Sequence, residues 1–253
     1  MCVKLIGIKN MPMISQGDDV GTIIIEAAES EGLEIMDHDV FVVAETVVSK
    51  AEGNLIKLDS IDISEEALEI SEKTSKDPRI VQTIIDESVE IIKVGPNFII
   101  SETKQGFVCA NAGIDESNVE TGFLKPVPQD SDKSASQIRT TIEAATGKEV
   151  AVILSDTQGR PFREGAVGVS LGVSGITPVW NRQGEKDLFE RELKTTTIAV
   201  ADELSAAASI VMGQADEGLP VVIIRGVEYV EKLRSTTSDI KPILRPKKFD
   251  IFR

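Results

Sequence analysis

Apolar residues recur along the chain with two spacings, one typical of helices and one typical of strands. In residues 17–32, Val20, Ile23, Ile24, Ala27 and Ala28 share one helical face between an aspartate and Gly32, which predicts a capped amphipathic helix. Further helices are predicted over 64–75, 77–92, 134–147 and much of 187–212. Runs rich in β-branched residues predict strands over 97–103, 106–114, 149–157, 165–180 and 220–226, and a strand ending in a glycine turn over 39–53.

Strand and helix signals alternate, and the short connection within 97–114 predicts a hairpin. This order predicts an α+β or mixed α/β fold, in which helices pack on mixed sheets. The chain contains neither GxxxxGK[ST] nor GxGxxG, so we expect neither a P-loop nor a Rossmann turn. We expect residues 1–253 to form a single catalytic unit of one or two lobes, with a basic tail over about 240–253.

The negative net charge of the chain limits the kinds of molecule that it can bind. The chain has 42 acidic and 27 basic side chains, a formal net charge of −15, which argues against binding to nucleic acid or to an anionic membrane. No apolar run is long enough for a membrane span, and two cysteines form no disulfide framework. We therefore expect a cytoplasmic protein.

The scarcity of histidine and cysteine narrows the chemistry further. His38 is the only histidine, and with Cys2 and Cys109 far away in sequence it predicts neither a zinc site nor a Ser–His or Cys–His nucleophile. An enzyme with this composition must use carboxylates, lysine, arginine and amides, with a hard cation such as Mg²⁺ or Mn²⁺.

Five stretches combine polar residues with loop signals beside predicted strands: 10–19, 45–53, 109–118, 151–165 and 211–218. Asn111, Asp115 and Asn118 offer oxygen ligands to a hard cation, and an Asx-rich turn explains them equally well. Asp156 is expected at a strand end, where it would hold a metal beside a phosphate that Arg160 and Arg163 bind. The alternative there is an ordinary surface ion pair.

Read in order, "SKAEG", "CANAGIDESN", "SDTQGRPFREG", "VADELSAAASIVMG" and "PVVIIRG" resemble the coenzyme F420 γ-glutamyl ligase family over about residues 5–230. The resemblance implies addition of L-glutamate to F420-0 with GTP as co-substrate, first at the phospholactyl carboxylate and then through γ-linkages. It also implies an intertwined homodimer of two-lobed subunits, and small molecules as the other partners.

The resemblance further implies roles for particular residues. Asp115 and Asp156 would bind one divalent ion, Mg²⁺ or Mn²⁺, with Thr157 and Gln214 near a second, and K⁺ is a further candidate ion. Asp156, Arg160 and Arg163 would be catalytic, in a reaction that passes through an acyl phosphate. The residues expected at the GTP are Met11, Pro12, Met13, Ile14, Glu45, Thr46, Lys50 and Asn118. Two other classes stay open: a metal-dependent GTP hydrolase or nucleotidyl enzyme, and a non-catalytic deazaflavin-binding protein.

Overall fold

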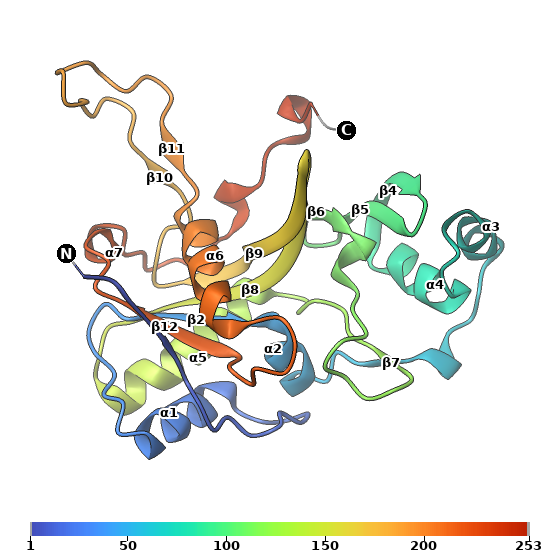
Figure 1. The fold of residues 1–253 in the computed structure, drawn as a ribbon, viewed down its shortest axis with the longest axis horizontal. Helices are drawn as coiled ribbons and strands as arrows, with labels where there is room; N and C mark the ends of the chain where they lie inside the picture. Colours follow the sequence, from blue (N-terminus) through green and yellow to red (C-terminus); the bar gives the residue numbers. More distant parts are fainter. Residues whose placement is uncertain (1, 252–253) are drawn as a thin grey trace.

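A five-stranded sheet forms the centre of the protein, whose computed structural model describes residues 2–251. Its strand order is β1 (Lys4–Gly7), β12 (Val221–Arg225), β2 (Val40–Ala44), β8 (Ala151–Arg160) and β9 (Arg163–Ser174) (Figure 1). β2 and β8 are parallel, and the other neighbours are antiparallel. The expectation of mixed sheets is confirmed.

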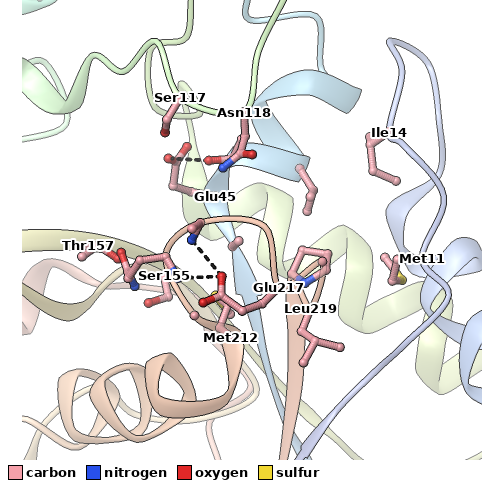
Figure 2. Close-up of a pocket in the computed structure, with 18 of the residues that line it drawn as sticks. Met11, Ile14, Glu45, Ser117, Asn118, Ser155, Thr157, Met212, Glu217 and Leu219 are labelled. Atoms are coloured by element: carbon pink, nitrogen blue, oxygen red, sulfur yellow. Dashed lines mark hydrogen bonds between the residues drawn. The ribbon is translucent and has the colours of Figure 1, made fainter.

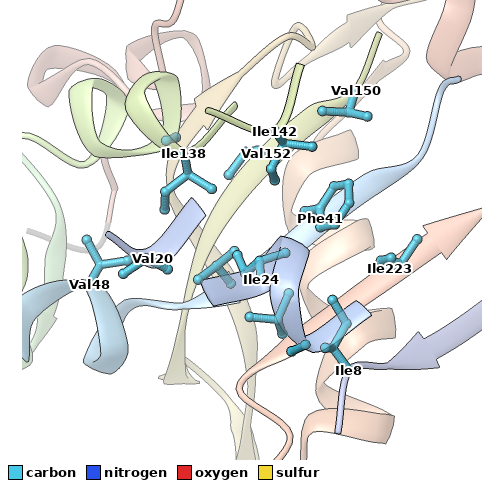
Figure 3. Close-up of a cluster of buried hydrophobic side chains, with 14 of the residues drawn as sticks. Ile8, Val20, Ile24, Phe41, Val48, Ile138, Ile142, Val150, Val152 and Ile223 are labelled. Atoms are coloured by element: carbon cyan, nitrogen blue, oxygen red, sulfur yellow. The ribbon is translucent and has the colours of Figure 1, made fainter. Parts of the chain in front are cut away.

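Helices cover both faces of this sheet. α1 (Val20–Ser30) and α5 (Ser131–Thr146) pack on one face, where Phe41 and Val152 contribute to the buried cluster (Figure 3). α6 (Val200–Met212) packs on the other face, against a cluster that includes Val42 and Ile153. Successive residues of β2 and β8 therefore enter opposite clusters, as the two-residue repeat of a strand requires.

β9 lies unusually close to both covering helices. A Cβ added at Gly168 would stand 2.4 Å from the backbone oxygen of Ser205 in α6, and one at Gly172 would stand 2.4 Å from the carbonyl carbon of Ser131 in α5. Only glycine fits at such distances, so these two positions set the separation of the layers.

A second, smaller unit carries its own hydrophobic cluster and lies at the right of Figure 1. Its antiparallel sheet contains β4 (Ser88–Gly95), β5 (Phe98–Thr103) and β6 (Val108–Ala110). α3 (Glu65–Thr74) and α4 (Pro78–Asp86) pack against it, and we call this unit the small lobe. β3 (Ile56–Lys57) pairs with β7 (Phe123–Leu124), so the chain enters and leaves the small lobe through a short ladder.

Two further segments complete the description. Residues 180–198 form an arm that projects from the body, with β10 (Trp180–Asn181) and β11 (Thr197–Ile198) at its base (Figure 1). The C-terminal segment docks on the body, since the Ile240 amide donates to Asp132 Oδ2 over 2.9 Å. It continues to the small lobe, where Lys247 forms an ion pair with Glu90, Nζ to Oε2 3.3 Å.

The structure corrects three predicted elements. The strand predicted within 39–53 ends at Ala44, and a helix, α2 (Glu45–Ala51), precedes the glycine turn. The helix predicted over 77–92 ends at Asp86, and β4 follows it from Ser88. The long helix predicted within 187–212 begins only at Val200. The residues before it are polar and form the arm, in which Arg182 N donates to Thr196 O over 2.9 Å.

Candidate functional site

One edge of the central sheet gathers the five polar stretches that the sequence singles out. β1, β2 and β8 run in the same direction and β12 runs against them, so the carboxyl ends of three strands and the start of the fourth share this edge. Ligand sites of open sheets lie in such crevices, outside the carboxyl ends of strands. A cavity of about 500 Å³ occupies this edge.

The cavity is lined by side chains from each of these stretches. Met11 and Ile14 lie on one wall, and Ser155 and Thr157 lie on the opposite wall (Figure 2). The loop after α6 closes a further side, where Glu217 accepts hydrogen bonds from the Gln214 and Ala215 amides over 3.1 and 2.8 Å. The segments that line the cavity are 11–14, 44–50, 115–118, 155–157 and 209–220.

Asp115 and Asp156 reach the cavity from different units of the fold. Asp156 lies within β8, opposite Val169, and accepts hydrogen bonds from its neighbours. Gln158 Nε2 donates to Asp156 Oδ2 over 3.0 Å, and the Thr157 amide donates to Oδ1 over 2.7 Å. Asp115 lies on the loop by which the chain leaves the small lobe. Its Oδ1 accepts hydrogen bonds from the Glu116 and Ser117 amides over 2.8 and 3.0 Å.

The pKa values of these two carboxyl groups move in opposite directions. Burial raises the pKa of Asp156 above its ordinary value, although Gln158 and the charge of Lys125 work against it, and the negative charge of Asp115 adds to the rise. Partial burial also works to raise the pKa of Asp115, but hydrogen bonds from Ser117 and the charge of Lys125 outweigh it, so that pKa is lowered. The two carboxylates repel each other, and a shared cation would relieve that repulsion.

A buried ion pair adjoins the cavity, and one of its two members belongs to the cavity lining. Glu45 begins α2 and is 2 % exposed, and its carboxylate pairs with Lys125 Nζ, which is 1 % exposed. Burial raises the pKa of Glu45 to about 7 even though the Lys125 charge lowers it, and Asp156 adds to the rise. The carboxylate of Glu45 is therefore held by Lys125, although Glu45 itself is among the residues that line the cavity.

Most of the predicted site residues come together in this cavity. It is lined by Met11, Pro12, Met13, Ile14, Glu45, Thr46, Lys50, Asp115, Asn118, Asp156, Thr157 and Gln214. Lys50 Nζ also donates to the Asn118 carbonyl over 3.3 Å, which connects α2 to the loop from the small lobe. The structure places these residues together, and their individual roles stay predictions.

Arg160 and Arg163 are not among the lining residues. β8 does not end at Asp156 but continues to Arg160, which pairs with Arg163 at the tip of the β8–β9 hairpin. Arg160 Nη1 donates to the Gly165 carbonyl over 3.2 Å, within the same hairpin. Asn111 also differs from expectation, because its side-chain oxygen accepts from the Ile99 amide over 3.2 Å inside the small lobe.

Sequence reasoning missed Lys125 altogether. A lysine between Leu124 and Pro126 resembles any surface lysine of a loop, and nothing in its neighbourhood indicates burial. Ser117 also escaped notice, although an Asp–x–Ser spacing is a recognisable signal for an Asx turn, and this one fixes Asp115.

The donors in the cavity are suited to a hard cation and a phosphate. Among residues 2–251, no cluster of three or more histidine, cysteine, aspartate and glutamate side chains is arranged to hold a metal. Two carboxylates with hydroxyl groups fit Mg²⁺ or Mn²⁺ nonetheless, because Mg²⁺ often takes one or two carboxylates and completes its shell with water and substrate phosphates. Lys50 supplies a positive charge on the same cavity.

Comparison with known proteins places the chain among its relatives. The family model described as F420-0:Gamma-glutamyl ligase matches residues 7–226. The chain belongs to this family. It is 58% identical over 253 residues to the coenzyme F420:L-glutamate ligase of Methanothermobacter thermautotrophicus, covering 100% of both chains. It is 51% identical over 251 residues to the protein of that name from Methanocaldococcus jannaschii, covering 99% of this chain and 97% of the relative.

Membership of the F420-0:γ-glutamyl ligase family confirms the resemblance that the sequence motifs carry. It also confirms that the protein is a ligase enzyme acting on small molecules. A more distant relative, the coenzyme F420:L-glutamate ligase of Methanosarcina mazei, is 42% identical over 253 residues, covering 100% of this chain and 96% of its own. No helix within residues 2–251 has the length and apolar character needed to span a bilayer.

Proposed function

We propose that this protein is a GTP-dependent ligase that adds L-glutamate to F420-0, first at the phospholactyl carboxylate and then through γ-linkages. The family description names the acceptor F420-0, and the relatives' names supply L-glutamate. The observation that carries the rest is that Asp115 and Asp156 line one cavity of about 500 Å³ together with Lys50. Two carboxylates and a lysine at the end of a sheet are a donor set for a metal–triphosphate complex.

In this proposal the γ-phosphoryl group of GTP passes to the acceptor carboxylate, giving GDP and an acyl phosphate. The amine of glutamate then attacks the carbonyl carbon, loses a proton and expels inorganic phosphate, which leaves an amide. Within residues 2–251, the side chains that line the cavity include neither histidine nor cysteine, which is consistent with direct transfer between substrates. Lys50 would bind phosphate oxygens, and Asn118 with residues 11–14 would border the nucleotide.

Asp115 and Asp156 would hold one divalent ion, Mg²⁺ or Mn²⁺, with Thr157 and Gln214 near a second, and K⁺ would be a further ion of the site. Such ions neutralise phosphate charge during transfer. The protein's own contribution is to orient the ligands: Gln158 fixes the Asp156 carboxylate, and Ser117 fixes that of Asp115. These outer contacts maintain the two oxygen donors on the cavity wall.

We also propose that the protein is a homodimer and that it works in the cytoplasm, where GTP is abundant. The arm supports the dimer, because it projects from the body and carries Leu188 and Phe189 with 100% and 78% of their surfaces exposed (Figure 1). Large apolar side chains on a projecting segment are typical of an interface between subunits.

One assay tests the proposed reaction. The protein is incubated with F420-0, GTP, Mn²⁺ and L-glutamate, and the product mass and GDP are followed together. The expected result is a mass increase of one glutamate residue for each GDP formed. GDP without a glutamyl product would instead indicate a hydrolase or nucleotidyl enzyme, and deazaflavin binding without GDP would indicate a non-catalytic binding protein.

A further inference from the structure

Lys125 is the most deeply buried cation near the proposed nucleotide site. It follows β7, at the exit from the small lobe, and its side chain is 1 % exposed. Its backbone is fixed to Asp115 by two hydrogen bonds: the Lys125 amide donates to the Asp115 carbonyl over 2.9 Å, and the Asp115 amide donates back over 3.1 Å. The residue that carries the buried charge therefore also fixes the backbone of a predicted metal ligand.

The side chain of Lys125 extends to α2, which contributes Glu45 to the cavity lining. Its Nζ pairs with the Glu45 carboxylate at the start of α2. A second contact runs parallel to it, since Ser49 Oγ in α2 donates to the Pro126 carbonyl over 2.9 Å. Segment 125–126 is thus attached to α2 by the ion pair of Lys125 and by the hydrogen bond of Pro126. The backbone of Lys125 is at the same time hydrogen-bonded to Asp115.

Lys125 does not line the cavity, so it does not touch a ligand there. Its charge nevertheless acts on three carboxyl groups: it opposes the rise that burial causes in the pKa of Glu45 and Asp156, and it contributes to the lowered pKa of Asp115. A buried ion pair is weak evidence for stability, since well-packed apolar residues often serve as well or better. The position of this pair suggests a reason other than stability for its presence.

We propose that Lys125 is a positioning residue: through its ion pair with Glu45 it holds the loop of Asp115 against α2, so that Asp115 and Asp156 can bind one divalent ion. The inference rests on the proposed metal–nucleotide function of the cavity. It assigns to Lys125 an effect on metal and GTP binding that is separate from any effect on folding.

The chain offers a matched control for the loss of a buried ion pair. Asp39 is 0 % exposed and pairs with Arg225, Nη2 to Oδ2 2.6 Å, immediately before β2, whereas Glu45 immediately follows that strand. Arg225 lies at the opposite edge of the sheet from the cavity and does not line it. Lys125→Met and Arg225→Met therefore each remove the cation of a buried pair, at opposite ends of β2.

The experiment measures Mn²⁺ affinity without nucleotide, from the electron paramagnetic resonance signal of free Mn²⁺, on protein that far-UV circular dichroism shows to be folded. Lys125→Met is expected to weaken Mn²⁺ binding by about 10- to 100-fold, as loss of groups that orient metal ligands does. Its KM for GTP should rise while its KM for glutamate is unchanged. Arg225→Met should retain the wild-type Mn²⁺ affinity.

A double variant separates positioning from folding if Lys125→Met alone does not fold. The variant Glu45→Gln/Lys125→Met has lost both charges of the buried pair, so it should fold. It should nevertheless bind Mn²⁺ no more tightly than Lys125→Met. Wild-type Mn²⁺ affinity and KM for GTP in either folded variant would overturn the inference. Absence of Mn²⁺ binding by the wild-type protein would instead overturn the proposed function itself.

Discussion

Asp39 and Glu45 are buried at opposite ends of one strand, β2, and each is paired with a cation from a distant part of the chain. Arg225 on β12 binds Asp39, and Lys125 beyond the small lobe binds Glu45. The first pair lies away from the cavity, whereas Glu45 of the second pair is among the residues that line it. Two similar interactions on one strand can therefore serve different purposes, and this makes them experimentally useful.

The raised pKa of Glu45 predicts a pH dependence of stability. Its native value is about 7 against an ordinary 4.5, so the native state retains a proton that the unfolded chain has lost within this window. The free energy of unfolding should therefore fall as the pH rises from 4.5 to 7, by at most about 1.4 kcal/mol per unit for this one group. Urea unfolding in the presence of EDTA, repeated at several pH values in this range, measures the free energy of unfolding and checks the prediction. Glu45→Gln should lack this contribution, so two parallel curves would contradict the prediction.

Replacing Asp156 should abolish ligation without unfolding the protein. Asp156→Asn keeps the shape of the side chain but removes a charge from the proposed metal site, so we expect more than about a 100-fold loss of kcat/KM, because changes in outer partners alone cost about 10- to 100-fold. The coupled assay of product mass and GDP measures it. Glu164→Gln, on the same hairpin but outside the cavity lining, is the control and should retain activity.

The hairpin arginines should affect the acceptor more than the nucleotide. Arg160 and Arg163 lie at the tip of the β8–β9 hairpin and do not line the cavity proposed for GTP. Arg160→Gln and Arg163→Gln should raise the KM for the anionic F420-0 by about 10-fold, corresponding to roughly 1.4 kcal/mol of lost charge interaction. Steady-state kinetics with each substrate varied in turn measures this. A selective rise in the KM for GTP would contradict this placement of the arginines.

The close approach of β9 to its helices predicts a sharp difference between glycines. Gly172→Ala would bring a methyl group within 2.4 Å of the Ser131 backbone, so α5 must shift, at a cost of about 1–3 kcal/mol. Gly159→Ala on the preceding strand meets no atom within 4 Å and has no positive φ, so its stability should change little. Chemical denaturation of both variants checks the pair, and equal stabilities would disprove the packing argument.

The arm predicts how assembly can be disrupted. The double variant Leu188→Ser/Phe189→Ser loses two exposed apolar side chains. If the dimer uses the arm, its dissociation constant should rise by at least about 10-fold, which corresponds to a loss of roughly 1.4 kcal/mol of binding free energy. Sedimentation over a concentration series measures it. Val89→Ser changes a side chain that is 64% exposed on the small lobe, and this control should sediment like the wild type.

Much of the central sheet and of the cavity was predictable because their signals are local. β2, the first four residues of β8 and the first four of β12 are continuous apolar runs, and α1 and α5 carry capped amphipathic patterns. Three candidate stretches adjoin these strands, since 45–53 follows β2, 151–165 contains β8 and 211–218 precedes β12, whereas 109–118 comes from the small lobe. Strands that share a direction bring their ends to one edge, so residues distant in sequence meet there.

The rest depends on contacts between distant segments, which local patterns do not contain. The polar residues of the arm have no helical face, and only cross-arm hydrogen bonds such as Arg182 to Thr196 define their conformation. Asp156 was expected at a strand end, but pairing with β9 extends the strand beyond it. Lys125 is buried against Glu45, which precedes the small lobe in the sequence, so its burial depends on a partner 80 residues away.

The order of strands also determines how the molecule can fold. β12, one of the last strands in the sequence, inserts between β1 and β2, two of the first. β1 therefore has no strand to pair with in this sheet until residues 221–225 are in place, and such long-range pairing slows folding. Since the loop before β12 is also a wall of the cavity, a stable sheet and a competent ligand pocket should emerge in a single kinetic phase.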